Sequence, residues 1–219
     1  TTNQIIYSGV YPVSWDTQLN SGGEFFLEAS QSGSALRVAD GEFLTVEIPA
    51  QAEDPNMELF LAGGVEDDLD SINWAPADST FTDSGFTFSS VDDTYTLSLD
   101  SLGWANIDAF MNSITYFDCY FNLTGVSGLN NSNTTAFSVF KNENAVWPVG
   151  VNSWGDITSN LITESHLGAI DLNLVVISVV GSQLYYGLLD VTPASMMTYD
   201  VAMTAVTAAD LDAIILALE

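Results

Sequence analysis

Alternating apolar and polar residues predict strands along most of the chain. In "DTYTLSLD", Tyr95, Leu97 and Leu99 share one face, a period of two that is typical of a strand. The segments "SGFTFSSV", "EFLTVEI", "MELFLAG" and "ITYFDCYFNLTGV" are further short apolar runs, and "LVVISVV" (Leu174–Val180) is apolar enough to indicate a buried strand. The clusters "DTQLNSGG", "VEDDLDS" and "SGLNNSNTT" are rich in turn-forming residues and separate these runs. Many short strands divided by turns predict an all-β fold of β-sandwich or jelly-roll type.

One pattern occurs twice in the chain. "TYTLSLDSLGWANIDAF" (Thr94–Phe110) aligns without a gap to "TYDVAMTAVTAADLDAI" (Thr198–Ile214). In each copy the strand period changes to helical spacing, and "TAAD" adds a helix-capping signal in the second copy. The sequence therefore predicts two tandem β-sandwich domains with short helical turns, at residues 1–128 and 144–219, joined by a polar junction at 129–143. The residues at helical spacing are Ile107, Phe110, Met111 and Ile114 in the first copy, and Leu211, Ile214, Ile215 and Leu218 in the second.

The second domain is expected to be the shorter repeat. The first copy is followed by the apolar segment "TYFDCYFNLTGV", which has no counterpart after the second copy. A sheet that lacks a strand exposes backbone groups, and a strand from another chain can cover them. The N-terminal segment is the expected donor of that strand, while the alternative is a strand supplied from within, by residues 137–140. The donor residues would be Ile5, Ile6, Tyr7, Val10 and Tyr11.

The charge balance excludes several classes of partner. Asp and Glu number 29 against 2 Lys and Arg, which gives a formal net charge of −27. Binding to nucleic acids or to anionic membranes requires basic residues that this chain lacks. The longest apolar run is too short to insert across a membrane. Such acidity is typical of proteins that work in high salt, where ions screen self-repulsion, and we expect a location outside the cell or in a virion.

The sequence contains few residues or motifs that are typical of catalytic sites. His166 is the only histidine and Cys119 the only cysteine. Aromatic neighbours indicate that Cys119 is a buried structural thiol, and His166 is expected to be a turn residue or a partner of Glu164. No nucleophile, phosphate-binding or dinucleotide motif is present, so we expect a protein that is not an enzyme. A glycosidase with an unidentified carboxylate pair is a third, more distant interpretation.

Two groups of residues suggest bound ions or glycans. Acidic loop residues supply the oxygen ligands that Ca²⁺ prefers, although a solvated loop is the simpler interpretation. Three Asn-x-Ser/Thr triplets are candidate glycosylation sites. The candidate calcium ligands are Glu66, Asp67, Asp68 and Asp70, with a second acidic pair at Asp92 and Asp93, and the candidate glycosylation sites are Asn122, Asn130 and Asn133.

Five tryptophans raise carbohydrate binding as an alternative function. Trp74 lies in the polar stretch "INWAPADST", which suits an exposed platform for a sugar ring, and Trp104 is a second candidate. Trp15 and Trp154 recur at equivalent places in "VSWDT" and "NSWGD" and are expected in the core. The segments "IIYSGVYPVSWD", "FLTVEI" and "TYTLSLDSLGWANIDAF" together resemble jelly-roll domains of the bacterial carbohydrate-binding-module type, and this resemblance implies a sandwich with sugar-binding aromatic residues.

These patterns predict a structural protein. The leading expectation is a non-enzymatic subunit that assembles with itself or with related subunits into a capsid, surface layer or filament adapted to high salt. Jelly rolls are common building blocks of capsids, a comparison made at the level of the fold. The alternative is a carbohydrate-binding surface protein.

Overall fold

A computed structural model describes residues 2–15, 17–50, 54–66, 71–77, 84–90, 92–111, 115–150 and 155–218. This part of the chain is nearly all β, which confirms the predicted fold class. The chain forms two units. Unit N comprises residues 12–66 and 72–111, and unit C comprises residues 1–11, 67–71 and 112–219.

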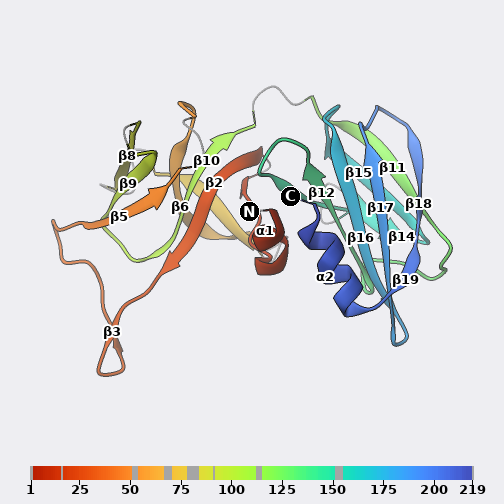
Figure 1. Ribbon diagram of the computed structural model, residues 1–219, viewed down its shortest axis with the longest axis horizontal. Coiled ribbons are helices and arrows are strands. Elements are labelled where there is room, and N and C mark those ends of the chain that lie inside the picture. Colours follow the sequence, from red (N-terminus) through yellow and green to blue (C-terminus); the bar gives the residue numbers. More distant parts are fainter. Residues whose placement is uncertain are drawn as a thin grey trace. The chain divides into compact units, whose positions relative to one another are not determined.

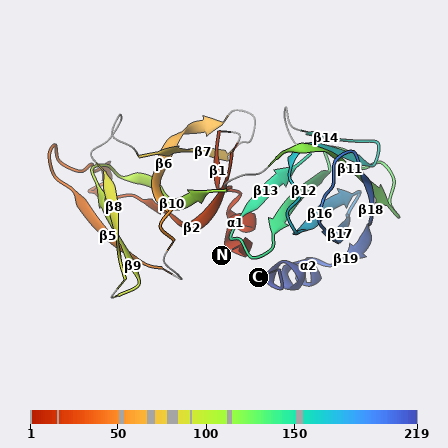
Figure 2. The same cartoon turned by 90° about the horizontal axis from the view of Figure 1, so that it is seen from above.

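Unit N contains two larger sheets that enclose a core. One sheet has the strand order β1-β2-β10-β6-β7 and the other β5-β9-β8. Leu59 and Ile107 of the first sheet pack against Tyr95, Leu97 and Leu99 of the second. Figures 1 and 2 show β5, β8 and β9 together, beside β6 and β10. The bounds are β1 Val13–Ser14, β2 Thr17–Leu27, β5 Leu44–Pro49, β6 Glu58–Glu66, β7 Ser71–Pro76, β8 Gly85–Ser89, β9 Thr94–Leu99 and β10 Gly103–Phe110.

Strand β10 lies where a helix was predicted, at the end of the first copy of the repeat. It pairs antiparallel with both β2 and β6, and Ala105, Ile107 and Ala109 are buried on one face. The helical spacing was therefore misleading, because pairing on both edges and burial of a period-two face favour a strand. Residues 17–23 of the segment "DTQLNSGG" are likewise part of β2 rather than a turn. At its bulge a Cβ on Gly22 would lie 2.8 Å from the carbonyl oxygen of Ile107, so only glycine fits there.

An exposed hairpin extends from unit N between β2 and β5. Strands β3 (Ser30–Gln31) and β4 (Ser34–Ala35) pair around Ser32 and Gly33, both of which have positive φ, as a two-residue hairpin turn requires. We name residues 28–43 the arm. Every residue of the arm is exposed except Val38, which is half-buried. Figure 1 shows the arm leaving the end of β2 away from the sheets of its unit.

Unit C is built from two further sheets. Their strand orders are β13-β12-β16-β17-β19 and β14-β15-β11-β18. Strand β11 follows the first copy of the repeat in sequence, yet it pairs in parallel with β18 of the second copy and antiparallel with β15. An earlier segment of the same chain thus pairs with the strand of the second copy. The bounds are β11 Phe117–Thr124, β12 Thr134–Phe140, β13 Val146–Val149, β14 Gly155–Thr158, β15 Leu161–Leu167, β16 Leu172–Val180, β17 Gln183–Val191, β18 Thr198–Ala202 and β19 Thr204–Val206.

The N-terminal segment is a helix rather than the predicted extended strand. Helix α1 (Thr2–Ser8) places Ile5 in a cluster with Phe137, Val139, Val146 and Val175, and Ile5 is only 2% exposed. Ile6 and Tyr11 pack against the same cluster, while Tyr7 is exposed and Val10 half-buried. The expected donor segment is therefore already packed within its own chain.

The C-terminal helix α2 (Ala208–Leu216) confirms the second predicted helix. Thr207 caps it, since its side chain accepts a hydrogen bond from the backbone N–H of Asp210 and the Asp210 side chain accepts one from Thr207. Tyr7 of α1 donates a hydrogen bond of 2.9 Å to Asp212 of α2. Figure 2 shows the two helices side by side. Leu218, just beyond α2, packs against the cluster around Ile5, to which Val175 of the predicted strand "LVVISVV" also belongs. No helix in the described ranges is both long and apolar enough to cross a membrane.

Candidate functional site

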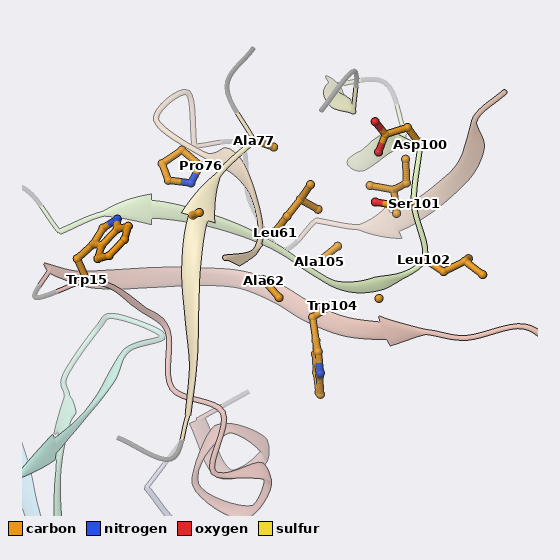
Figure 3. A pocket seen from close by; sticks show the side chains of 13 residues that line it. Trp15, Leu61, Ala62, Pro76, Ala77, Asp100, Ser101, Leu102, Trp104 and Ala105 are labelled. Carbon is orange, nitrogen blue, oxygen red and sulfur yellow. The ribbon is translucent and has the colours of Figure 1, made fainter. Parts of the chain in front are cut away.

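Unit N contains a cavity of about 670 Å³. Its walls come from the middle of β6, the end of β7, the start of β10 and the loop that connects β9 to β10. Most of the lining is apolar, with Leu61, Pro76, Leu99 and Leu102 as its larger aliphatic residues (Figure 3). Cavities of this size with mainly apolar walls are typical binding sites for small ligands or for a partner's side chain.

Trp15 lies at one end of this cavity and is exposed. Its side chain is 63% exposed, so the prediction that Trp15 belongs to the core is wrong. Its φ of 56° is costly for any residue but glycine. The backbone N–H of Trp15 donates a hydrogen bond of 2.7 Å to the side-chain oxygen of Asn73, which is only 4% exposed. A buried side chain thus holds an exposed indole in a strained backbone conformation, an arrangement that favours a binding role.

Trp74 differs from the sequence-based prediction, whereas Trp104 lines the cavity. Trp74 lies in β7 with an exposed fraction of 0%, so it is not an exposed platform. Its ring packs edge-on against Trp104, with 6.3 Å between ring centroids, and Trp104 also contacts Phe26. Trp104 lines the cavity, but Figure 3 shows its ring on the side of β10 opposite to Leu61 and Ala105. Neighbouring residues of a strand point to opposite faces, which explains this orientation. Trp154 lies outside the described residues.

The polar end of the cavity carries Asp100 and Ser101. The hydroxyl of Ser84 donates a hydrogen bond of 2.8 Å to Asp100, and the backbone N–H of Asp100 donates one of 2.9 Å to the Ser84 hydroxyl. Asp100 is therefore held in place at the cavity wall. A carboxylate there, in a chain of net charge −27, disfavours anionic ligands and favours neutral or cationic groups.

Unit C contains a buried carboxyl group at Glu164, which is 2% exposed. Burial raises the pKa of Glu164 to about 7, although three backbone N–H groups partly oppose the rise. Gly150 donates to one oxygen at 2.8 Å, and Ser165 and His166 donate to the other at 3.0 and 2.8 Å. Sequence analysis paired Glu164 with His166, and the structure shows that the pairing is made by the backbone N–H of His166. This carboxyl group ties β15 to the end of β13.

Cys119 and His166 lie in environments that favour structural roles. Cys119 is fully buried, as predicted, and burial together with Glu164 and Asp118 raises the pKa of its thiol to about 12. A neutral thiol is a poor nucleophile. His166 lies in strand β15 rather than in a turn. Its ring stacks on Trp147 and packs against Tyr116. Both residues fit a structural role.

Asp108 is a second buried carboxyl group, which sequence analysis missed. It is 0% exposed, and burial raises its pKa well above the usual range. Asn106 donates a hydrogen bond of 2.6 Å to one of its oxygens. Within the described part of the chain, the other oxygen has no hydrogen-bond partner. Asn106 and Asp108 are two residues apart in β10, so the period of the strand places both on the face opposite to Ile107.

The candidate metal and glycan sites are described only in part. Asp67, Asp68 and Asp70 and the side chain of Glu66 lie outside the described residues, so a calcium site there stays a prediction. Among described residues, no three His, Cys, Asp or Glu side chains gather closely enough to hold a metal ion. The side-chain nitrogens of the candidate glycosylation sites all donate hydrogen bonds within the chain: Asn122 to Asp200 at 2.7 Å, and Asn130 and Asn133 to the Gly128 carbonyl at 3.2 and 3.0 Å.

A comparison with protein-family models, with curated protein sequences and with solved structures gives no match to this chain. The fold and the geometry described above are therefore the basis for inferring its function.

Proposed function

We propose that this protein is a non-enzymatic structural subunit that assembles with copies of itself, outside the cell or in a virion, in a salty environment. The observation that carries the proposal is the exposed arm of unit N. Its apolar side chains have few contacts within the chain: Leu36 is 47% and Phe43 48% exposed. Apolar groups on a projecting hairpin are typical of segments that bind another subunit.

The charge of the protein supports the same proposal in a specific way. Copies that each carry a formal net charge of −27 repel one another in dilute buffer. At molar salt the Debye length falls to about 3 Å, so contacts between apolar residues can hold copies together. Assembly should therefore strengthen as NaCl is raised, whereas assembly driven by ion pairs would weaken.

Sedimentation velocity over a range of protein and NaCl concentrations tests the proposal. We expect large species at high concentration and high salt, and fewer of them in a variant with Leu36→Ser and Phe43→Ser. Both substituted positions are exposed, so the variant should keep the wild-type circular dichroism spectrum. A wild-type protein that stays monomeric at molar NaCl, with and without Ca²⁺, would contradict the proposal.

Carbohydrate binding is the second candidate function, and the exposed indole of Trp15 favours it. An indole ring offers an apolar face to a sugar, and Asp100 and Ser101 add polar groups in the same cavity. Titration with neutral oligosaccharides, followed by tryptophan fluorescence, should then give a saturable change that Trp15→Phe removes. Phe43→Ala, which removes an exposed aromatic residue outside the cavity, is the matched control and should leave the change intact.

A further inference from the structure

We propose that the arm of one copy binds in the Trp15 cavity of a second copy, with Leu36 against the apolar wall and Arg37 beside Asp100. This inference rests on the proposed function and deepens it, because it names the two surfaces through which subunits join. The occupant of the cavity is then a second copy of this chain.

The apolar parts of the two surfaces match. The cavity is lined by Leu61, Pro76, Leu102 and several alanines, and its volume of about 670 Å³ is large enough for several side chains. Leu36 is exposed on a narrow hairpin, which is the shape that can enter such a cavity. Burial of one exposed leucine contributes roughly 1.5–3 kcal/mol.

The charges match as well. The chain has only two basic residues, Arg37 and Lys141. Lys141 contacts Asp190 at 2.5 Å and its side chain is 33% exposed, whereas the Arg37 side chain is 85% exposed. Arg37 pairs only loosely with Asp40, at 3.8 Å between two exposed groups, a kind of contact that contributes little. The arm therefore carries the more accessible cation of the protein next to Leu36, and the cavity it would enter carries the fixed carboxylate of Asp100.

The position of the arm explains why the contact joins different copies. Leu27, the last residue of β2, pairs with Gly103, which lines the cavity, so the arm starts beside the cavity wall. From there the arm runs outward, and Leu36 and Arg37 stay exposed rather than filling the cavity of their own chain. Two different surfaces that bind head to tail form a repeating contact, which produces a filament or a closed ring.

A pair of complementary variants tests the inference. Leu36→Glu places a charge on the arm, and Ala62→Glu places one at an exposed position of the cavity wall. Leu188→Glu is the matched control, because Leu188 is an exposed leucine of β17 in unit C. All three proteins should keep the wild-type circular dichroism spectrum, and the readout is sedimentation velocity at molar NaCl.

The expected result depends on mixing. Leu36→Glu disrupts the arm but keeps a working cavity, and Ala62→Glu disrupts the cavity but keeps a working arm. Each variant alone lacks one of the two surfaces and should be monomeric. A mixture of equal amounts should form dimers and nothing larger, since each pair can make only one intact contact. The Leu188→Glu control should assemble like the wild type.

Other outcomes overturn the inference in distinguishable ways. If the wild type assembles and either variant alone does so equally well, the arm and cavity are not the contact, and only the proposed function survives. Monomeric variants that fail to form dimers on mixing would show that the arm does not bind the cavity. A wild-type protein that stays monomeric removes both proposals, and saturable binding of a neutral oligosaccharide in the Trp15 cavity of those monomers would assign the cavity to glycans.

Discussion

The two units differ in the segments that lie outside their sheets. Unit C packs α1 onto β12, β13 and β16 through Ile5, and Tyr7 of α1 reaches α2 through a hydrogen bond. Unit N has no helix in its described part, and it leaves an arm exposed and a cavity open. Both units have exposed apolar side chains, but in unit N two of them, Leu36 and Phe43, lie on a projecting arm. We infer that unit C mainly provides stability and that unit N provides the contact surface.

Replacement of Ile5 should lower the free energy of unfolding more than any other substitution proposed here, and it tests the difference between the two units. Ile5→Ala removes a side chain that is 2% exposed in the core of unit C, and it should lower the free energy of unfolding by about 3 kcal/mol. Leu36→Ala shortens a side chain that is 47% exposed on the arm, and it should change that free energy by less than about 0.5 kcal/mol. Denaturant unfolding of dilute protein measures both values. Equal losses for the two variants would mean that the arm is packed in solution.

The buried carboxyl group of unit C should make stability depend on pH. The pKa of Glu164 rises from 4.5 to about 7 on folding, so the folded chain binds more protons than the unfolded chain between these values. The contribution of Glu164 to stability is therefore largest below pH 4.5 and falls as pH rises through about 7, by roughly 3 kcal/mol in total.

Glu164→Gln isolates this contribution, because it removes the titrating group. Denaturant unfolding from pH 5 to pH 8 should show a smaller decline for the variant than for the wild type. Asp108, whose pKa is also raised by burial, is present in both proteins and cancels in the difference. Parallel curves for the two proteins would show that Glu164 is not protonated on folding.

Loss of the side chain that holds Trp15 should have a moderate effect on unit N. Asn73→Ala removes the acceptor of the Trp15 backbone N–H and should lower the free energy of unfolding by about 1–2 kcal/mol. Assembly should weaken too, because Trp15 would no longer be held at the cavity. Asn56→Ala changes an exposed asparagine in the same unit and should leave stability and assembly almost unchanged. Equal effects of the two substitutions would contradict the role assigned to Asn73.

Substitution of the residue that caps α2 in unit C should give the smallest change in the free energy of unfolding. Thr207→Ala removes the side-chain acceptor at the start of α2 and should lower the free energy of unfolding by about 1 kcal/mol. Thr207→Ser keeps a hydroxyl at the cap, and serine is at least as favourable as threonine there, so the free energy of unfolding should change little. Thermal unfolding of the two variants side by side measures the difference. A serine variant as unstable as the alanine variant would point to packing of the threonine methyl group instead.

Local sequence signals predicted those elements whose pattern was unambiguous. The period of two over β9 and the capping residues of α2 both gave correct elements. Strand β10 was mistaken for a helix, because the apolar residues after Gly103 fit both periods and only pairing with β2 and β6 decides between them. Helix α1 was missed for a similar reason, since its apolar residues suit a strand and its packing on β12 and β16 is not local.

The candidate site was less accessible to sequence analysis. Trp15 has a positive φ, and its backbone N–H is bonded to Asn73, which is 58 residues away in the sequence. No local sequence pattern indicates a contact over that separation. Trp74 was predicted to be exposed because its flanking residues are polar, yet its packing against Trp104 buries it. Burial of Asp108 and Glu164 depends on the strands that pair around them, and a chain with 29 acidic residues offers no sequence signal that distinguishes these two.

The most direct test of the central claim is the sedimentation behaviour of the wild type as NaCl is raised to molar concentration. We expect a monomer at low salt and large species at high salt, and the double variant Leu36→Ser, Phe43→Ser should stay mostly monomeric throughout. A wild-type monomer under all conditions would contradict the claim that this chain is a self-assembling structural subunit.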